Sequence, residues 1–261
     1  MSHAMLHQFL VSDLVVPVGL AQEPGQECLT RFGARLGDAT RLAPDLIVFR
    51  KGQVEGDLPC IAGAPVLAVE VVSPVSRAAD LGAKRDLYAR AGVQAYWVVD
   101  ADDAAEPELV VHALSADGRY AAERVPWGGS LRLTRPFAID LAPQEIFRPP
   151  RRVTPRRRAA MPDVIAQENG PDLPPAGEPV LLDVFDRRWP TGAEKTELWD
   201  GCPVFYGIWD ERDVRAAQSV YPGRLVRLDQ APGEPGTMTV LPAPEPAPQT
   251  AGAAGGTDAA T

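Results

Sequence analysis

The chain has 261 residues, of which 23 are Gly and 27 are Pro, and hydrophobic residues make up 45% of it. This composition favours one medium-sized domain with loose segments over two fully packed domains. Asp and Glu (35) outnumber Lys and Arg (26), and the formal net charge of −9 excludes a uniformly basic protein that coats nucleic acid. No membrane partner is expected, because the most apolar uncharged run, Leu58 to Val69, is too short to span a bilayer.

Apolar runs alternate with turn residues over the first half of the chain, and they predict a mixed sheet with a crossover helix. The elements expected in chain order are a short β-rich run at 14–18, strands at 46–49 and 66–72, a helix at 76–91 closed by Gly92, a strand at 95–99, a hairpin at 109–114 and 120–125, and a last strand at 131–141. The run 66–72 (VLAVEVV) is almost continuously β-branched, which is typical of a strand covered on both faces.

Composition divides the chain into four parts. Residues 1–147 are expected to form a globular α/β domain, and 148–179 read as an Arg- and Pro-rich linker. Residues 180–229 are expected to form a small hairpin–helix module that includes a helix at 211–221. Residues 230–261, rich in Ala, Pro, Gly and Thr without periodicity, are expected to be disordered.

The few cysteines and histidines limit the chemistry that the chain can support. Three widely spaced cysteines predict neither a disulfide framework nor a zinc ribbon, and three histidines cannot build a histidine-rich metal cage. Reduced thiols and the lack of a visible export signal favour a cytoplasmic location. Any metal is therefore expected to be held by carboxylates.

Two acidic residues lie at positions where a buried carboxylate costs free energy. Glu70 lies inside the apolar strand VLAVEVV, where a carboxylate must stay neutral or find a cation. Asp45 begins the preceding strand, directly after a proline that restricts its backbone. If the two strands pair, both carboxylates can converge at one end of the sheet.

The predicted helix supplies a cation for this end of the sheet. At about 100° per residue, Asp80, Lys84, Leu87, Tyr88 and Ala91 share one helical face. Lys84 lies in the middle of the face that should pack on the sheet, and Asp80 precedes it at the i, i+4 spacing that allows contact. A lysine that faces a core needs a partner, and Glu70 and Asp45 are the candidates.

This set of groups is suited to metal-assisted phosphodiester hydrolysis. Two carboxylates on separate strands can hold Mg²⁺, which takes oxygen ligands and keeps several waters. The ion can activate water and neutralise charge on a phosphate, and Lys84 can assist the water or the developing charge. The alternative is a buried salt bridge with no catalytic role.

The residues also resemble a known family. The segments APDLIVF and LAVEVVSPVSRAADLGAKRDLYARAGVQAYWVVD resemble the Uma-two family of restriction-endonuclease-like proteins, within the PD-(D/E)XK nuclease superfamily, over roughly Asp13 to Phe147. The resemblance implies a restriction-endonuclease-like mixed sheet with flanking helices, Mg²⁺-dependent cleavage of DNA, and a cytoplasmic bacterial setting. It implies that Asp45 and Glu70 are metal ligands and that Lys84 is the catalytic lysine, with Val72 at the lysine position usual in the superfamily. Asp80 and Tyr88 match family positions and are expected to support the site.

One part of the family pattern is expected at an unusual place. Similar proteins usually open with a helix and a Glu-Leu-x-Asp-Gly hairpin, followed by a helix that packs against the site, and this chain is expected to begin too late for that opening. Residues 197–201 (ELWDG) resemble the hairpin but follow the nuclease core. The module either docks as a permuted first hairpin or is a remnant of a second copy. A self-contained hairpin with ordinary core aromatics is a third interpretation.

The arginine run and the oligomeric state leave further alternatives open. The run is expected either to be a solvated linker, to contact an acidic part of the same chain, or to contact DNA phosphates through Arg151, Arg152, Arg156, Arg157 and Arg158. Superfamily nucleases that cut both strands are often dimeric, which leaves a homodimer open. The main rival to an active endonuclease is a nuclease-fold protein that has lost cleavage and acts as a DNA-binding or protein-interaction module. A metal-free scaffold with a structural ion pair is the third class.

Overall fold

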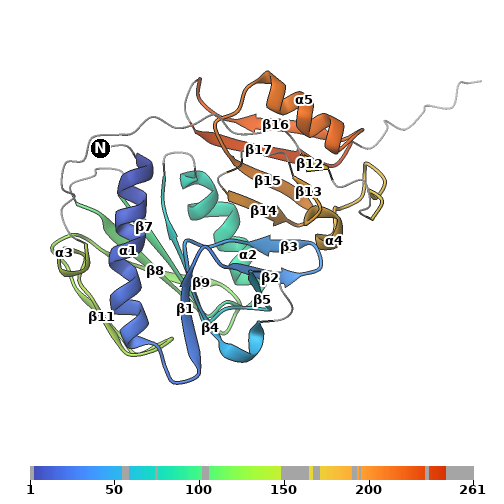
Figure 1. Ribbon diagram of the computed structural model, residues 1–261. Coiled ribbons are helices and arrows are strands. Elements are labelled where there is room, and N and C mark those ends of the chain that lie inside the picture. The colour runs from blue at the N-terminus through green and yellow to red at the C-terminus, as the bar shows by residue number, and fades with distance from the viewer. Residues whose placement is uncertain are drawn as a thin grey trace, which may run out of the picture.

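Two large β-sheets, two two-stranded sheets and five α-helices lie in the part of the chain that the computed structural model describes. This part comprises residues 3–54, 59–73, 76–101, 106–147, 165–166, 171–189, 193, 195–232 and 235–244. Figure 1 shows the N-terminal elements in blue and green and the C-terminal module in orange. None of the described helices combines the length and the apolar character that crossing a bilayer requires.

A mixed six-stranded sheet forms the centre of the N-terminal part. Its order is β1 (Gln26–Thr30), β4 (Leu46–Arg50), β6 (Leu67–Val71), β7 (Ala95–Asp100), β8 (Glu108–Leu114) and β9 (Tyr120–Val125). Only β6 and β7 are parallel, and the other neighbouring strands are antiparallel. The predicted strands at 46–49, 66–72 and 95–99 and the predicted hairpin are therefore present. The expected α/β mixed sheet with flanking helices is confirmed.

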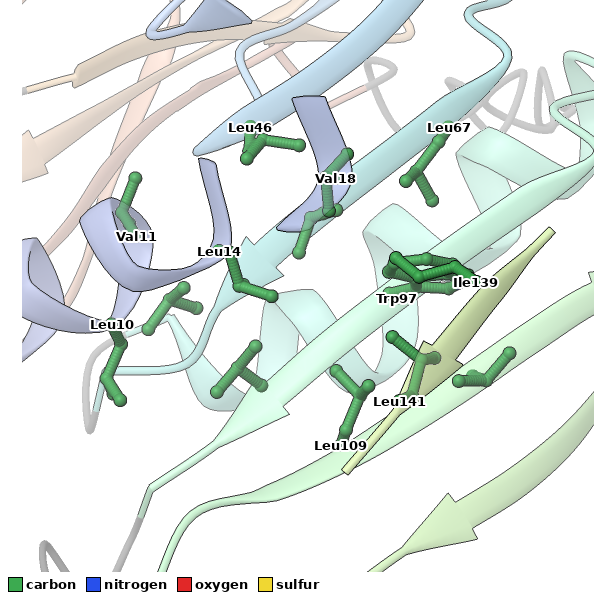
Figure 2. Packing of buried hydrophobic residues seen from close by; sticks show 14 of the residues in the cluster. Leu10, Val11, Leu14, Val18, Leu46, Leu67, Trp97, Leu109, Ile139 and Leu141 are labelled. Carbon is green, nitrogen blue, oxygen red and sulfur yellow. The ribbon is translucent and has the colours of Figure 1, made fainter. Parts of the chain in front are cut away.

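One face of this sheet is covered by an N-terminal helix that the sequence interpretation missed. The β-rich run expected at 14–18 is wrong, because these residues belong to α1 (His3–Ala21). Its buried positions Leu6, Leu10, Leu14 and Val18 recur every four residues and pack on the sheet. Figure 2 shows the last three of them. Burial of this stripe outweighs the local β-preference of the β-branched residues there.

The opposite face of the sheet is covered by the crossover helix. The helix predicted at 76–91 consists of a π-helical turn, η2 (Ala79–Ala83), followed by α2 (Lys84–Arg90), and Gly92 ends it with φ +77°. Side chains on β6 alternate between the two covers: Val69 and Val71 pack with α1, whereas Ala68 and Val72 pack with α2. Glu70 is in phase with the second set and so faces α2.

A second, seven-stranded sheet joins the two ends of the chain. Its order is β16 (Leu225–Asp229), β17 (Gly236–Leu241), β15 (Cys202–Gly207), β14 (Lys195–Trp199), β3 (Thr40–Leu42), β2 (Gly33–Gly37) and β5 (Cys60–Ala62). Leu198 on β14 is paired with Arg41 on β3, which places the C-terminal hairpin beside the N-terminal elements (Figure 1).

The C-terminal module has a core of its own that includes α4 (Leu182–Phe185) and α5 (Glu211–Val220). Asp200 and Gly201, at the tip of its first hairpin, both have positive φ (47° and 78°), which is the conformation of a two-residue type I′ turn. Residues 236–241 form β17, which lies between β16 and β15 in the second sheet, although the sequence predicted disorder from residue 230.

Two smaller strand pairs lie outside these sheets. The single strand expected at 131–141 is instead two short antiparallel strands, β10 (Leu131–Leu133) and β11 (Ile139–Leu141), followed by α3 (Pro143–Ile146). Pro136 lies between them and lacks the N–H that a continuous strand would use. β12 (Ile165–Ala166) pairs with β13 (Arg188–Trp189). The arginine run at 148–158 lies outside the described residues.

Candidate active site

Glu70 is the centre of a buried cluster of charged side chains. Its side chain is 1% exposed in the middle of β6, and α2 brings Lys84 and Tyr88 to it. Nζ of Lys84 lies 3.1 Å from Oε1 of Glu70, and the Tyr88 hydroxyl donates to the same oxygen at 3.3 Å. The predicted contact between the strand acid and the helix lysine is therefore present.

Lys84 is enclosed by carboxylates on three sides. Besides Glu70, its Nζ lies 2.9 Å from Oδ1 of Asp80 and 3.5 Å from Oε1 of Glu197, and the side chain has no exposed surface. Burial alone lowers the pKa of an ammonium, but the negative charges of Asp80, Glu197 and Glu70 outweigh it and hold the pKa of Lys84 well above its ordinary value. Lys84 is therefore charged at neutral pH.

The C-terminal hairpin contributes two site residues that the sequence reasoning did not single out. Nζ of Lys195 lies 3.0 Å from Oε2 of Glu70 and 3.3 Å from Oε1 of Glu197. Glu197 also accepts hydrogen bonds from the backbone N–H of Ala43 (3.0 Å) and from the Tyr206 hydroxyl (2.8 Å). The motif ELWDG contained a signal for Glu197, but nothing local indicates that this strand pairs with β3.

Asp45 lies at the edge of the cluster and is held by two donors. The backbone N–H of Val71 donates to its Oδ2 at 2.8 Å, and His7 Nε2 lies 3.1 Å from the same oxygen. Burial raises the pKa of this carboxyl, but the charge of Lys195 and the bond to His7 outweigh burial, so the pKa of Asp45 lies far below its usual range. His7 was missed because its helix was not predicted.

The cluster carries more negative than positive charge. Four carboxylates (Asp45, Glu70, Asp80 and Glu197) face two ammonium groups (Lys84 and Lys195), which leaves two negative charges uncompensated when all are ionised and His7 is neutral. Burial of Glu70 raises the pKa of its carboxyl to about 8, although the charges of Lys195 and Lys84 lower it. A divalent cation would balance the two negative charges of the fully ionised cluster.

The donor set fits Mg²⁺ in chemistry and charge, although no ready-made cage is present. Within the described ranges, no three His, Cys, Asp or Glu side chains gather into a group that could hold a metal ion. Magnesium does not need one, because it is usually bound by one or two carboxylates together with water and substrate phosphates. Asp45 directly precedes β4, the neighbour of the strand that holds Glu70, and the Asp45 N–H donates to the Val69 carbonyl at 3.0 Å.

Asp45 is also the acid that reaches the surface. A pocket of about 270 Å³ is lined by Asp45, by His7 and its neighbours on α1, and by Thr30 and Arg31 at the end of β1. Asp45 keeps 14% of its side chain exposed, whereas the carboxylates of Glu70, Asp80 and Glu197 are at most 1% exposed. Asp45 is therefore the carboxylate of the cluster that a ligand in this pocket can reach.

Comparison with known proteins gives the class of this site. The model of the Uma2 (Uma-two) family, described as "Putative restriction endonuclease", matches residues 2–169, which is more than half of the chain. The chain belongs to this family, and membership indicates a nuclease of the restriction-endonuclease type. A search of curated proteins found no match.

A solved structure is also similar to the chain. It is the crystal structure of a "putative nuclease belonging to DUF820" from Anabaena variabilis ATCC 29413, with 17% sequence identity and a TM-score of 0.45. The similarity covers 54% of this chain and 80% of that one.

Proposed function

We propose that the protein is a Mg²⁺-dependent endonuclease that hydrolyses phosphodiester bonds of DNA. The observation that carries the proposal is the cluster in which Asp45, directly before β4, and Glu70, on the neighbouring strand β6, are accompanied by two lysines and two further buried carboxylates. Family membership supports the reaction class. A cytoplasmic location is part of the proposal, since DNA is the substrate.

In this proposal Asp45 and Glu70 hold the metal. When bound, Mg²⁺ supplies a water of lowered pKa and offsets charge on the phosphate. Val71 and His7 fix one oxygen of Asp45, and Lys84 and Lys195 each take one oxygen of Glu70, so both carboxylates are oriented before substrate arrives. The cation of Lys84 also favours the ionised form of Glu70 that a metal ligand requires.

The assignment of Lys84 to the attacking water is modified by this proposal. Its Nζ has no exposed surface and is engaged by Asp80, Glu70 and Glu197. We therefore assign Lys84 to the positioning of Glu70, with Asp80 and Tyr88 as supporting residues. DNA phosphates are proposed to contact Arg151, Arg152, Arg156, Arg157 and Arg158, and a homodimer would allow both strands to be cut.

A plasmid-nicking assay tests the proposal. Wild-type protein is expected to nick supercoiled DNA with Mg²⁺ and to lose nicking with EDTA, while Glu70→Gln and Lys84→Ala lower the rate by about 100-fold. Lys51→Ala is the matched control, because Lys51 is exposed and pairs only with Glu27 among the described residues. Equal nicking by wild type, Glu70→Gln and Lys84→Ala contradicts the proposal. Chemical denaturation of each variant separates lost activity from lost folding.

A further inference from the structure

Lysine is rare in this chain and concentrated at the acidic cluster. The sequence contains 23 arginines but only three lysines, Lys51, Lys84 and Lys195. Two of the three lie against Glu70. Arginine and lysine differ physically: the ammonium is a compact point charge on a flexible stem, whereas guanidinium is a wide planar fork. A chain that otherwise uses arginine therefore places lysine where a compact charge is needed.

The two site lysines differ in what their ammonium groups can reach. Lys84 has no exposed surface, and its ammonium lies within ion-pair distance of the carboxylates of Asp80, Glu70 and Glu197. Lys195 keeps 21% of its side chain exposed, and among the described residues its ion-pair partners are Glu70 and Glu197. One donor of Lys195 thus has no carboxylate partner in this part of the chain.

Lys195 is also the lysine of the cluster that reaches solvent, because 21% of its side chain is exposed and none of that of Lys84. It influences the ionisation of both proposed metal ligands: its positive charge is the largest of the contributions that lower the pKa of Asp45, and it also lowers the pKa of Glu70. Asp45 in turn is the carboxylate of the cluster that lines the pocket. Because its Nζ lies 3.0 Å from Oε2 of Glu70, the ammonium of Lys195 is next to one proposed metal ligand, where it could reach a phosphate bound at Glu70.

We propose that Lys195, supplied by the C-terminal module, is the ammonium that contacts the scissile phosphate of DNA, and that Lys84 only positions Glu70. This inference rests on the proposed nuclease function. Lys195 donates a hydrogen bond to a non-bridging phosphate oxygen and offsets the charge that builds there, without forming or breaking a covalent bond. The catalytic machinery is then completed by a strand about 125 residues after Glu70 in the chain.

The pairing of β14 with β3 holds Lys195 beside Glu70. Leu198 is fully buried and is the residue paired with Arg41. Arg41 also forms an ion pair at 2.5 Å with Asp186 of the C-terminal module. Contacts of these kinds fix β14 on the core, and the alternation of its side chains places Lys195 and Glu197 on the same face.

Kinetics of methionine variants of the full chain test the inference. Methionine keeps the length of the lysine stem and removes the charge. Lys195→Met is expected to lower the single-turnover nicking rate by about 100-fold, with folding retained, while Lys51→Met nicks like wild type. If Lys195→Met nicks within about threefold of wild type while Glu70→Gln is inactive, the inference is wrong and the nuclease function stands. If wild type nicks no faster than Glu70→Gln, the nuclease function itself fails.

Amine labelling gives a readout that does not depend on cleavage. With three lysines, acetylation by acetic anhydride can be followed at each site by mass spectrometry. Lys51 is expected to react fastest, Lys195 more slowly and Lys84 not at all in the folded chain. Adding duplex DNA with Ca²⁺ should protect Lys195 and leave Lys51 unchanged. Labelling of Lys195 that is unaffected by bound DNA, or a Lys195 as unreactive as Lys84, overturns the inference.

Discussion

The ammonium of Lys195 lies 3.0 Å from Oε2 of Glu70, although 125 positions separate the two residues in the chain. His7 near the N-terminus contacts Asp45 at the same cluster. The candidate site is therefore assembled from α1, the residue before β4, β6, η2, α2 and β14. It includes residues of the C-terminal module as well as of the segment that matches the family.

Removal of the C-terminal module should destabilise the core. A 1–150 fragment loses β14 from the edge of β3 and exposes Leu42, which is fully buried in the full chain. We expect the melting temperature to fall by about 10 °C relative to the full chain, as measured by calorimetry. This result favours the interpretation of the module as a permuted first hairpin. An undiminished melting temperature excludes it.

Lys84 should be essential for stability. Lys84→Met leaves Glu70, Asp80 and Glu197 buried without this cation, and breaking a buried pair in this way typically costs about 3–5 kcal/mol. Urea denaturation measures the loss. The exposed control Lys51→Met should change the free energy of unfolding by no more than about 0.5 kcal/mol. Similar values for the two variants contradict the buried network.

Stability without metal should decrease as pH rises through the neutral range. The pKa of Glu70 is raised from 4.5 to about 8 in the folded chain, so between these values the unfolded state is ionised while the folded state keeps a proton. The unfolded state then binds fewer protons, and stability falls by at most about 1.4 kcal/mol per pH unit. The raised pKa of His7, where Asp45 outweighs the lowering effect of burial, acts in the same direction.

The variant Glu70→Gln isolates this effect. It removes the titrating carboxyl, so the free energy of unfolding, measured in EDTA at a series of pH values, should change less with pH than in wild type. The smaller slope due to His7 should remain. If the free energy of unfolding changes equally with pH in wild type and Glu70→Gln, Glu70 is not the cause of the pH dependence.

The central site could be predicted from the sequence because its signals are local. A carboxylate inside VLAVEVV and a lysine on the apolar face of a helix are both anomalies that periodicity reveals, and the distance between Lys84 and Glu70 agrees with them. The turn at Asp200 and Gly201 and the helix that follows were predictable for the same reason.

The missed parts depend on long-range pairing. The sequence of residues 14–18 is compatible with a strand or a helix. The burial of Leu10, Leu14 and Val18 against the sheet favours the helix α1. β17 follows a segment rich in Pro and Gly, and its pairing with β15 and β16 stabilises it. Lys195 was missed because no local pattern shows that β14 lies next to β3.

The arginine run should contribute to DNA affinity through electrostatics. Replacing Arg151, Arg152, Arg156, Arg157 and Arg158 by Gln should lower the slope of log affinity against log salt by up to about 4.5, if each contacts one phosphate. Fluorescence anisotropy with duplex DNA at several salt concentrations measures the slope. Arg215→Gln, on the exposed side of α5, is the control. An unchanged slope in the fivefold variant identifies the run as a linker.

The dependence of DNA nicking on Mg²⁺ in an Asp45 variant tests the central claim most directly. Asp45→Asn keeps the size of the side chain and its acceptor oxygen for the Val71 N–H, but removes the charge of one proposed ligand. Under single-turnover conditions the nicking rate should fall by at least about 100-fold at every Mg²⁺ concentration, while the protein stays folded. A folded Asp45→Asn protein that nicks at the wild-type rate with the same Mg²⁺ dependence contradicts the account.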